Sequence, residues 1–406
     1  MLVASKTSAM KVTTGKGTIP LIALISIWSV SAVVSLPGLA ISPILEELDT
    51  IFPSASKLEV EMLESLPSLM IIPFMLLAGR WSVRHSKLRL LVLGCAIFLI
   101  GGIGCTLSRT LIELIVTSTL TGIGAGIIIP LSTGLIVDYF TGDYRVKQLG
   151  ISSAINNLTL VIATLAVSYL ADIEWHLAFV VYLLPAITLL LVPALSHTTA
   201  VPEPKEGAQH RQEAINRNVI IGLMLFYFVI TYTSLIVTYN TSYLVAEMGF
   251  SDTTSSIVIA IFFLAIMAPG LMLNTIIRIF GNKVNLFSLA AMTLGLLAMS
   301  LPHPTYVTLV IGAILVGGGY GIMQPIIYDK AATNAPPSLS TYALSIVMVV
   351  NYLAILVAPF LLNLSAHLTS VHHANSTFIV NAAITLALMV VCAFTYRTNR
   401  VFGNDD

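Results

Sequence analysis

Long apolar stretches, each bounded by charged or turn-forming residues, recur along the whole chain. A helix needs about 20 mostly apolar residues to cross the hydrocarbon core of a bilayer, so runs of this length predict membrane-spanning helices. Six runs precede the middle of the chain, near 18–44, 58–79, 88–108, 111–138, 146–171 and 175–195. Six more follow, near 218–246, 253–277, 284–302, 305–328, 338–366 and 374–396. The pattern predicts an all-α membrane protein with 12 transmembrane helices that lies in a lipid bilayer.

One extended hydrophilic segment separates the two sets of helices. Residues 197–217 are rich in Pro, Glu, Lys, His and Arg and contain no apolar run. The segment is too short to fold as a domain of its own. We therefore divide the chain into an N-terminal half (1–196), a linker (197–217) and a C-terminal half (218–406).

The two halves share a sequence pattern at an offset of 195 residues. Asn156 in the predicted fifth helix matches Asn351 in the predicted eleventh. In the fourth and tenth helices, the matched positions are Gly122, Gly124, Gly126 and Pro130 with Gly317, Gly319, Gly321 and Pro325. Duplicated six-helix halves are a recurring plan in transporters, with the substrate site near the bilayer midplane between them. We expect two pseudo-symmetric halves.

Composition and charge placement support this picture. Hydrophobic residues make up 57% of the chain and charged residues 9%, against roughly 25% charged in soluble proteins. With both termini and the linker in the cytoplasm, 17 of the 19 Lys and Arg residues fall on that side, and only Lys57 and Arg109 do not. This asymmetry is typical of cytoplasmic loops. The formal net charge is zero, and nothing indicates binding to nucleic acid. The first apolar run follows lysines, but it is too long for a signal peptide, so we expect an uncleaved helix.

The loop between the second and third helices carries a familiar pattern. Gly79-Arg-Trp-Ser-Val-Arg84-His-Ser-Lys87 resembles the loop signature of the major facilitator superfamily, in which a Gly is followed by an Asp-Arg pair, a second Gly and a basic cluster. Val83 stands at the Asp position and Ser86 at the second Gly. With the six-plus-six split and the repeat, the chain is identified as a member of that family, most similar to bacterial drug:proton antiporter-type members.

The resemblance implies alternating access in a monomer in the bacterial cytoplasmic (inner) membrane, with Gly79, Arg84 and Lys87 as the conformational-loop motif. The sequence departs from the antiporters at two places. Ser118 stands where their fourth helix has an Arg four residues before Gly122, and the fifth helix lacks their Gly-rich run ending in Gly-Pro. An antiporter with this sequence would not use the usual residues in its proton path.

Ionisable groups inside a bilayer are costly, so each one is a functional hypothesis. Glu61 and Glu64 share one face of the second helix at i, i+3 spacing, and Glu64 is the deeper of the two. Asp329 continues the Gly317, Gly321 and Pro325 face of the tenth helix. We predict Glu64, Asp329 and Glu61 as proton-coupling candidates. The alternatives are an outer vestibule acid in water for the glutamates and a helix-end charge for Asp329.

Polar and aromatic positions near the middle of the helices are candidates for substrate binding. Buried amides must find partners, so Asn156, Asn157 and Asn351 either bridge helices or bind substrate. Aromatic stripes suit amphipathic or cationic ligands, although ordinary helix packing also produces them. The candidates in such stripes are Trp28 in the first helix, Tyr232, Tyr239 and Tyr243 in the seventh, and Tyr320, Gln324 and Tyr328 in the tenth.

These features predict a secondary active transporter, with a small molecule and protons as its partners. The expected activity is proton-coupled efflux of amphipathic, neutral or cationic compounds. The alternatives are proton-coupled uptake of a neutral metabolite such as a sugar or nucleoside, and a non-transporting membrane sensor. No Walker loop, dinucleotide fingerprint or catalytic triad signature is present, so we expect no enzyme activity, no cofactor and no metal site.

Overall fold

The computed structural model describes residues 11–37, 57–196, 214–249, 252–368 and 374–395, and the isolated positions 44, 48, 51–53, 55 and 401. Most of the predicted linker and the side chains of Glu61 and Glu64 lie outside these described residues.

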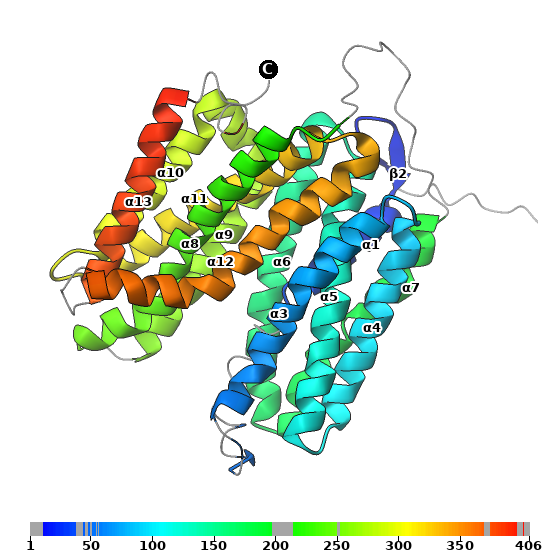
Figure 1. Ribbon diagram of the computed structural model, residues 1–406, viewed down its shortest axis with the longest axis horizontal. Helices are drawn as coiled ribbons and strands as arrows, with labels where there is room; N and C mark the ends of the chain where they lie inside the picture. The colour runs from blue at the N-terminus through cyan, green and yellow to red at the C-terminus, as the bar shows by residue number, and fades with distance from the viewer. Residues whose placement is uncertain are drawn as a thin grey trace, which may run out of the picture.

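The described chain is a bundle of long helices in two groups (Figure 1). The helices of the N-terminal half are α1 (Leu21–Val33), α3 (Lys57–Trp81), α4 (Lys87–Leu107), α5 (Leu111–Tyr139), α6 (Gly142–Ala171), the 3-10 helix η2 (Trp175–Leu183) and α7 (Pro185–Ser196). The helices of the C-terminal half are α8 (Arg217–Glu247), α9 (Asp252–Phe280), η3 (Gly281–Lys283), α10 (Val284–Met299), α11 (Tyr306–Thr333), η4 (Pro337–Leu339), α12 (Ser340–Leu368) and α13 (Ala374–Thr395). Each of the twelve predicted ranges overlaps a helix, so the all-α membrane fold class is confirmed.

Length and composition identify membrane-crossing candidates among these helices. Within the described residues, nine stretches are long and apolar enough to cross a membrane, and one of them, 254–299, contains both α9 and α10. Two shorter apolar helices, Leu21–Val33 and Ser65–Trp81, lie beside them. This arrangement is consistent with the predicted count of twelve, which stays a prediction.

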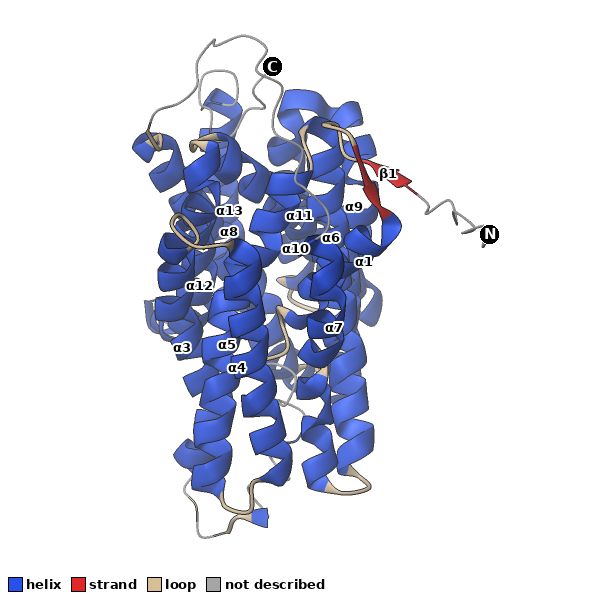
Figure 2. Cartoon of the chain, turned by 90° about the vertical axis from the view of Figure 1, so that its right-hand side faces the viewer, coloured by secondary structure: helices blue, strands red, loops and turns tan. Residues whose placement is uncertain are grey.

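The start of the chain differs from expectation. The predicted helix 18–44 is wrong at its beginning, because Thr18–Pro20 forms strand β2, which pairs antiparallel with β1 (Lys11–Thr13). Gly15 makes the turn with φ of 85°, a conformation that glycine adopts without strain. The Thr141 amide donates to the Thr14 carbonyl at 3.0 Å, which ties the hairpin to the start of α6. Figure 2 shows the hairpin at one end of the bundle.

Two further helices differ in detail. The predicted segment 175–195 is a 3-10 helix up to Leu183 and an α-helix from Pro185. Proline has no N–H for the helical hydrogen-bond ladder but is favoured in the first turn, so a new helix begins there. Helix α11 continues to Thr333, which places Asp329 inside its last turns.

The repeat is present in the packing of the helices. A Cβ added at Gly122 of α5 would lie 2.3 Å from the carbonyl oxygen of Pro67 of α3. A Cβ at Gly317 of α11 would lie 2.5 Å from the carbonyl oxygen of Phe262 of α9. The packing partners are also separated by 195 residues (262 − 67). Glycine is required at both places because the backbones touch.

The same offset relates a second pair of contacts and the caps of the two helices. Gly126 packs on Ile71, and Gly321 packs on Ile266. Helix α5 begins with a capping box of Thr110 and Glu113, and α11 begins with one of Thr305 and Thr308, again 195 residues apart. The α3–α5 pair and the α9–α11 pair are therefore structural copies.

The two halves meet closely at the end of the bundle where α7 ends and α8 begins, which we call the linker end. Helix α6 starts at this end and α9 finishes there. A Cβ added at either Gly150 or Gly270 would lie 2.3 Å from the carbonyl oxygen of the other. At the same end, on the other side of the interface, a Cβ at Gly79 of α3 would lie 2.0 Å from the Oγ of Ser345 of α12. The halves are thus in backbone-level contact at the linker end.

Candidate functional site

A cavity of about 90 Å³ lies between the halves, lined by α1, α5 and α6 on one side and by α11 and α12 on the other. One buried water needs about 10–15 Å³ by the same measure, so several could fit. Four lining residues are apolar: Val34, Ile129, Leu149 and Met348. The other eleven carry a hydroxyl or an amide: Ser31, Ser35, Ser132, Thr133, Ser152, Ser153, Asn156, Gln324, Tyr328, Asn351 and Tyr352. No lining residue is charged.

Small hydroxyl side chains form the wall of the N-terminal half. The Oγ of Ser31 on α1 lies 2.7 Å from the Oγ of Ser152 on α6 and 3.3 Å from the Oγ of Ser132 on α5. Serine occupies little volume, so three helices approach one another here while space remains between the halves. These hydroxyls both donate and accept hydrogen bonds.

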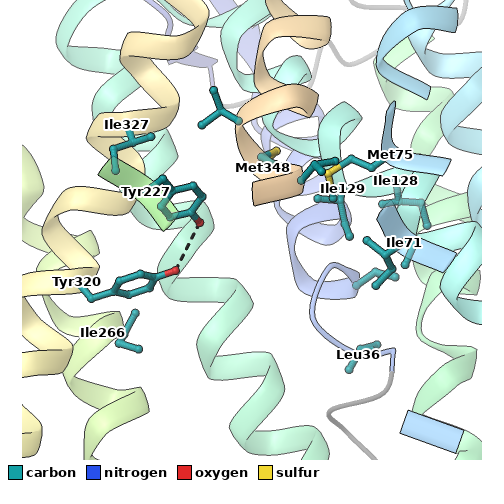
Figure 3. Close-up of a cluster of buried hydrophobic side chains, with 14 of the residues drawn as sticks. Leu36, Ile71, Met75, Ile128, Ile129, Tyr227, Ile266, Tyr320, Ile327 and Met348 are labelled. Atoms are coloured by element: carbon teal, nitrogen blue, oxygen red, sulfur yellow. Dashed lines mark hydrogen bonds between the residues drawn. The ribbon is translucent and has the colours of Figure 1, made fainter. Parts of the chain in front are cut away.

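A tyrosine cluster supports the wall of the C-terminal half. Tyr328 lines the cavity, and Tyr227 of α8 lies behind it at the centre of the cluster. The hydroxyl of Tyr227 lies 2.7 Å from that of Tyr328, and the Tyr320 hydroxyl donates to it at 3.5 Å. Figure 3 shows Tyr227 and Tyr320 with their hydroxyl groups directed at each other. Tyr227 is fully buried, and the cluster holds α8 and α11 together through polar groups that need such partners.

Two amides complete this cluster. Asn351 of α12 donates from Nδ2 to the hydroxyls of Tyr227 (3.0 Å), Thr231 (3.2 Å) and Tyr320 (2.9 Å). Gln324 donates from Nε2 to Tyr227 at 3.0 Å and to Tyr328 at 3.3 Å. Both amides line the cavity, yet their donor groups are used inside the C-terminal half.

Gln324 also connects the two walls. Its Oε1 accepts a hydrogen bond from the Oγ of Ser153 on α6 at 3.0 Å. The two residues are 171 positions apart and belong to different halves. A polar bridge therefore crosses the cavity region.

The two neighbouring asparagines of α6 are in different environments. Asn156 lines the cavity, and its buried Oδ1 has no hydrogen-bond partner within the described part of the chain. Asn157 does not line the cavity, and its Nδ2 donates to the backbone oxygen of Ser153 at 2.8 Å. The structure thus brings Asn156, Gln324, Tyr328 and Asn351 of the predicted substrate-binding residues to the cavity.

The other predicted substrate-binding residues lie elsewhere. Trp28 donates from Nε1 to the Oε1 of Gln148 at 3.0 Å, within the N-terminal half. Tyr320 is behind the cavity wall as part of the tyrosine cluster. Three tyrosines of α8 are not among the lining residues: Tyr232 is buried, Tyr239 is half-buried in the core, and Tyr243 is 69% exposed.

The predicted coupling carboxylate Asp329 is in an ion pair between the halves. Its Oδ1 lies 2.5 Å from the Nε of Arg145 on α6, and both side chains are mostly buried, at 20% and 14% exposure. Lys87 of the loop motif pairs with Asp138 at 2.7 Å within the N-terminal half. Arg84 of the motif is exposed. The coupling roles stay predictions.

Sequence reasoning missed the centre of the cluster and the partner of Asp329. Tyr227 and Thr231 share one face of α8 at i, i+4 spacing, a signal that marks a polar face on an otherwise apolar helix. The serines and threonine of the N-terminal wall give no distinct sequence signal, because small hydroxyl residues are common where membrane helices pack. In the sequence, Arg145 is one of the 17 Lys and Arg residues on the cytoplasmic side, and no local pattern marks its partner.

Comparison with known proteins decides the family. The family model described as Major Facilitator Superfamily matches residues 23–359. The chain belongs to this superfamily. Its members are multi-pass membrane transporters and not enzymes, so the predicted family and the absence of an enzyme class are confirmed.

Two curated relatives and one solved structure are similar to this chain. "Multidrug resistance protein 3" of Bacillus subtilis (strain 168) is 28% identical over 148 residues, 36% of this chain and 28% of that protein. "Multidrug transporter protein MdtP" of the same organism is 32% identical over 119 residues, 29% of this chain and 21% of that protein. The chain therefore matches less than a third of the length of these relatives.

The solved structure is that of the proton:xylose symporter XylE bound to 6-bromo-6-deoxy-D-glucose. It superposes with a TM-score of 0.71 over 93% of this chain and 95% of that one, at 14% sequence identity. At this identity the likeness shows the fold of the chain alone.

Proposed function

We propose that this protein is a secondary active transporter that exports a small, uncharged, hydrogen-bonding compound in exchange for protons. One observation carries the proposal: eleven of the fifteen cavity-lining residues present a hydroxyl or an amide, and none is charged. Hydrogen-bonding groups in a cavity between the halves reject cargo that leaves them unpaired and so select cargo that pairs with them.

The same lining argues against a cationic cargo. A cation taken out of water needs a paired anion or a dense set of oxygen ligands. None of the fifteen lining residues is a carboxylate, and the tyrosines Tyr227 and Tyr328 direct their hydroxyls at each other. Within the predicted range of amphipathic, neutral or cationic compounds, the cavity favours the neutral ones.

Export is supported by two relatives, one named for multidrug resistance and the other for multidrug transport. Uptake of a neutral metabolite, such as a sugar or nucleoside, is the second candidate, and the hydroxyl and amide lining favours it equally. Both candidates share the same site and the same class of cargo. They differ in the direction of net flux.

Alternating access requires the contacts at the linker end to separate. With both termini in the cytoplasm, as the Lys and Arg distribution indicates, the structure is closed toward the cytoplasm. The Arg145–Asp329 ion pair and the Gly150–Gly270 contact hold that side closed. Proton coupling needs a carboxylate that changes protonation during this cycle, and Asp329, Glu64 and Glu61 are the proposed candidates.

The test uses purified protein in proteoliposomes with an imposed pH gradient. Radiolabelled D-glucose and uridine serve as neutral probes and tetraphenylphosphonium as the cationic probe. We expect uphill movement of at least one neutral probe that a proton uncoupler abolishes. Movement of tetraphenylphosphonium alone would contradict the neutral cargo, and neutral transport that ignores the pH gradient would contradict proton coupling. Reversing the gradient gives the direction.

A further inference from the structure

We propose that Asn351 selects the cargo, and that its side-chain oxygen Oδ1 accepts a hydrogen bond from an O–H or N–H group of the bound compound. Asn351 lies on α12 and lines the cavity. The inference rests on the proposed function and narrows its cargo to neutral compounds that carry at least one hydrogen-bond donor.

Three amide side chains line the cavity, and their oxygens are in different conditions. The Oε1 of Gln324 already accepts a hydrogen bond from Ser153 at 3.0 Å. The Oδ1 of Asn156 is buried and does not face the cavity. The Oδ1 of Asn351 has no hydrogen-bond partner within the described residues, and it is not shielded as that of Asn156 is. Asn351 therefore supplies the open amide acceptor of the cavity wall.

The nitrogen of the same amide is held behind the wall. The Nδ2 of Asn351 donates to the hydroxyls of Tyr227 (3.0 Å) and Thr231 (3.2 Å) on α8 and of Tyr320 (2.9 Å) on α11. Figure 3 shows Tyr227 and Tyr320 with their hydroxyls close together. The nitrogen and the oxygen of an amide are bonded to one planar carbon and point in different directions. Because Nδ2 is fixed on the cluster, Oδ1 is left on the side of the cavity.

This anchoring makes Asn351 a preorganised acceptor. An amide oxygen accepts hydrogen bonds and cannot donate them, whereas the hydroxyls of the wall can turn to do either. Because Nδ2 is bonded to two neighbouring helices, the side chain does not have to be ordered when cargo binds. A cargo without a donor would displace water from Oδ1 and leave it unpaired, and this loss lowers the affinity for such a cargo.

The acceptor at Asn351 divides neutral compounds into two classes. Compounds with hydroxyl or N–H groups, such as polyols, sugars, nucleosides and secondary amides, can pair with Oδ1. Compounds with acceptors alone, such as ethers, esters and tertiary amides, cannot. The hydroxyls of Ser35 and Thr133 line the same cavity, but they adapt to donors and acceptors alike and so do not separate the two classes. Asn351 is therefore the residue that sets this preference.

The test removes a donor from the cargo and the acceptor from the protein. In proteoliposomes, transport of D-glucose and uridine is compared with that of 3-methyluridine and of analogues in which one hydroxyl at a time is replaced by fluorine, which is small and cannot donate. In the wild type, at least one analogue should be moved about tenfold more slowly than its parent, since a lost hydrogen bond has about that effect. In Asn351→Leu, that analogue and its parent should be moved at equal rates.

The measured quantity is the ratio of the parent rate to the analogue rate, because a merely structural role would lower both rates and keep their ratio. Asn381→Leu is the matched control, since Asn381 is a fully buried asparagine of α13 that does not line the cavity, and it should keep the wild-type ratio. Asn351→Asp retains an oxygen at the place of Oδ1 and should keep it too. A wild-type ratio in Asn351→Leu, or a lost ratio in Asn351→Asp, would overturn the inference.

A second variant applies if Asn351→Leu does not fold. Thr231→Val combined with Tyr320→Phe removes two of the three hydroxyls that hold Nδ2. The amide then turns more freely, so the ratio should fall by about threefold, although neither residue lines the cavity. An unchanged ratio in this double variant would also overturn the inference.

The two levels of the proposal fail separately. Uphill transport with an equal ratio in the wild type and in Asn351→Leu overturns the inference and leaves the proposed function intact. A wild type that moves neither parent probe contradicts the proposed function, and the inference is then decided by binding. A melting temperature that a parent probe raises more than its analogue does, with the difference lost in Asn351→Leu, supports the inference. A wild type without such a difference overturns it.

Discussion

Arg145 and Asp329 join the two halves of the protein at the linker end, with Nε 2.5 Å from Oδ1. The symmetry-related place is occupied differently. Asp329 corresponds to Gly134 in the repeat (329 − 195), and a Cβ at Gly134 would lie 2.5 Å from the Oγ1 of Thr341 of α12. One side of the interface is held by charge, and the other by close packing of the α5 backbone on a side chain of α12.

Breaking this ion pair should open the linker end. Asp329→Asn should raise the population open at that end about fivefold, since a mostly buried pair contributes about 1 kcal/mol or more. The measurement is the rate at which a linker-side thiol reagent labels a cysteine at position 153, in a chain without Cys95, Cys105 and Cys392.

The control for that experiment is Glu174→Gln, which removes the charge of an exposed glutamate within one half. It should leave the labelling rate at position 153 unchanged. The exchanged pair Arg145→Asp with Asp329→Arg should restore slow labelling. Equal rates in Asp329→Asn and Glu174→Gln would show that the inter-half pair does not hold the closed state.

The helix crossing at Gly150 and Gly270 should not tolerate a side chain. Gly150→Ala would place a carbon 2.3 Å from the Gly270 carbonyl oxygen, and overpacking of this kind costs about 1–3 kcal/mol. We expect the halves to separate at the linker end and the initial transport rate to fall. Gly318→Ala is the control, because a Cβ at Gly318 has no described neighbour within 4 Å. A normal rate in Gly150→Ala would mean that the crossing is not maintained during transport.

Removing the hydroxyl of Tyr227 should destabilise the C-terminal half. Tyr227→Phe leaves the donors of Gln324 and Asn351 without one of their acceptors, at a cost of about 1–3 kcal/mol for each buried group left unpaired. The melting temperature in detergent should fall by several degrees. Tyr243→Phe is the control, since Tyr243 is exposed, and it should melt with wild type. Equal melting temperatures of the two variants would show that the Tyr227 hydroxyl does not stabilise the C-terminal half.

Neutralising the coupling carboxylate should abolish proton-driven transport of cargo without abolishing the exchange of cargo across the membrane. For whichever of Glu64 and Asp329 is the coupling group, replacement by its amide (Glu64→Gln or Asp329→Asn) should abolish uphill transport driven by a pH gradient and leave exchange of cargo across the membrane intact. Glu174→Gln, at an exposed glutamate, is the control and should keep both activities. Full uphill transport in both amide variants would show that neither Glu64 nor Asp329 is the coupling group. Glu61 would then be the remaining candidate.

The helices could be predicted from the sequence because their lengths are determined locally. The run predicted at 111–138 is α5 at Leu111–Tyr139, and the run predicted at 146–171 ends with α6 at Ala171. Bilayer thickness requires about 20 apolar residues per crossing, so each helix appears in the sequence as one continuous apolar run. The hairpin at Lys11–Pro20 escaped because two three-residue strands leave no comparable signal.

The candidate site was predictable only in part. The repeat located Asn156 and Asn351, and a polar residue in an apolar helix is visible without a structure. The partners were not visible. Asn351 meets Tyr227 across 124 positions, and Arg145 meets Asp329 across 184. Such contacts depend on the rotation of each helix about its axis and on its tilt against its neighbours, which single-helix patterns do not contain.

By itself, the sequence determined the helical class, the division into two repeated halves and the polar positions on each helix, because these depend on local composition and on one internal offset. The tertiary structure decided which polar groups are satisfied and which face the cavity. Asn156 and Asn351 are the same residue at the same place in each repeat. Only the packing of α8 and α11 around Asn351 supplies hydroxyl partners to the amide nitrogen of one of them, and the Oδ1 of the other is buried without a partner among the described residues.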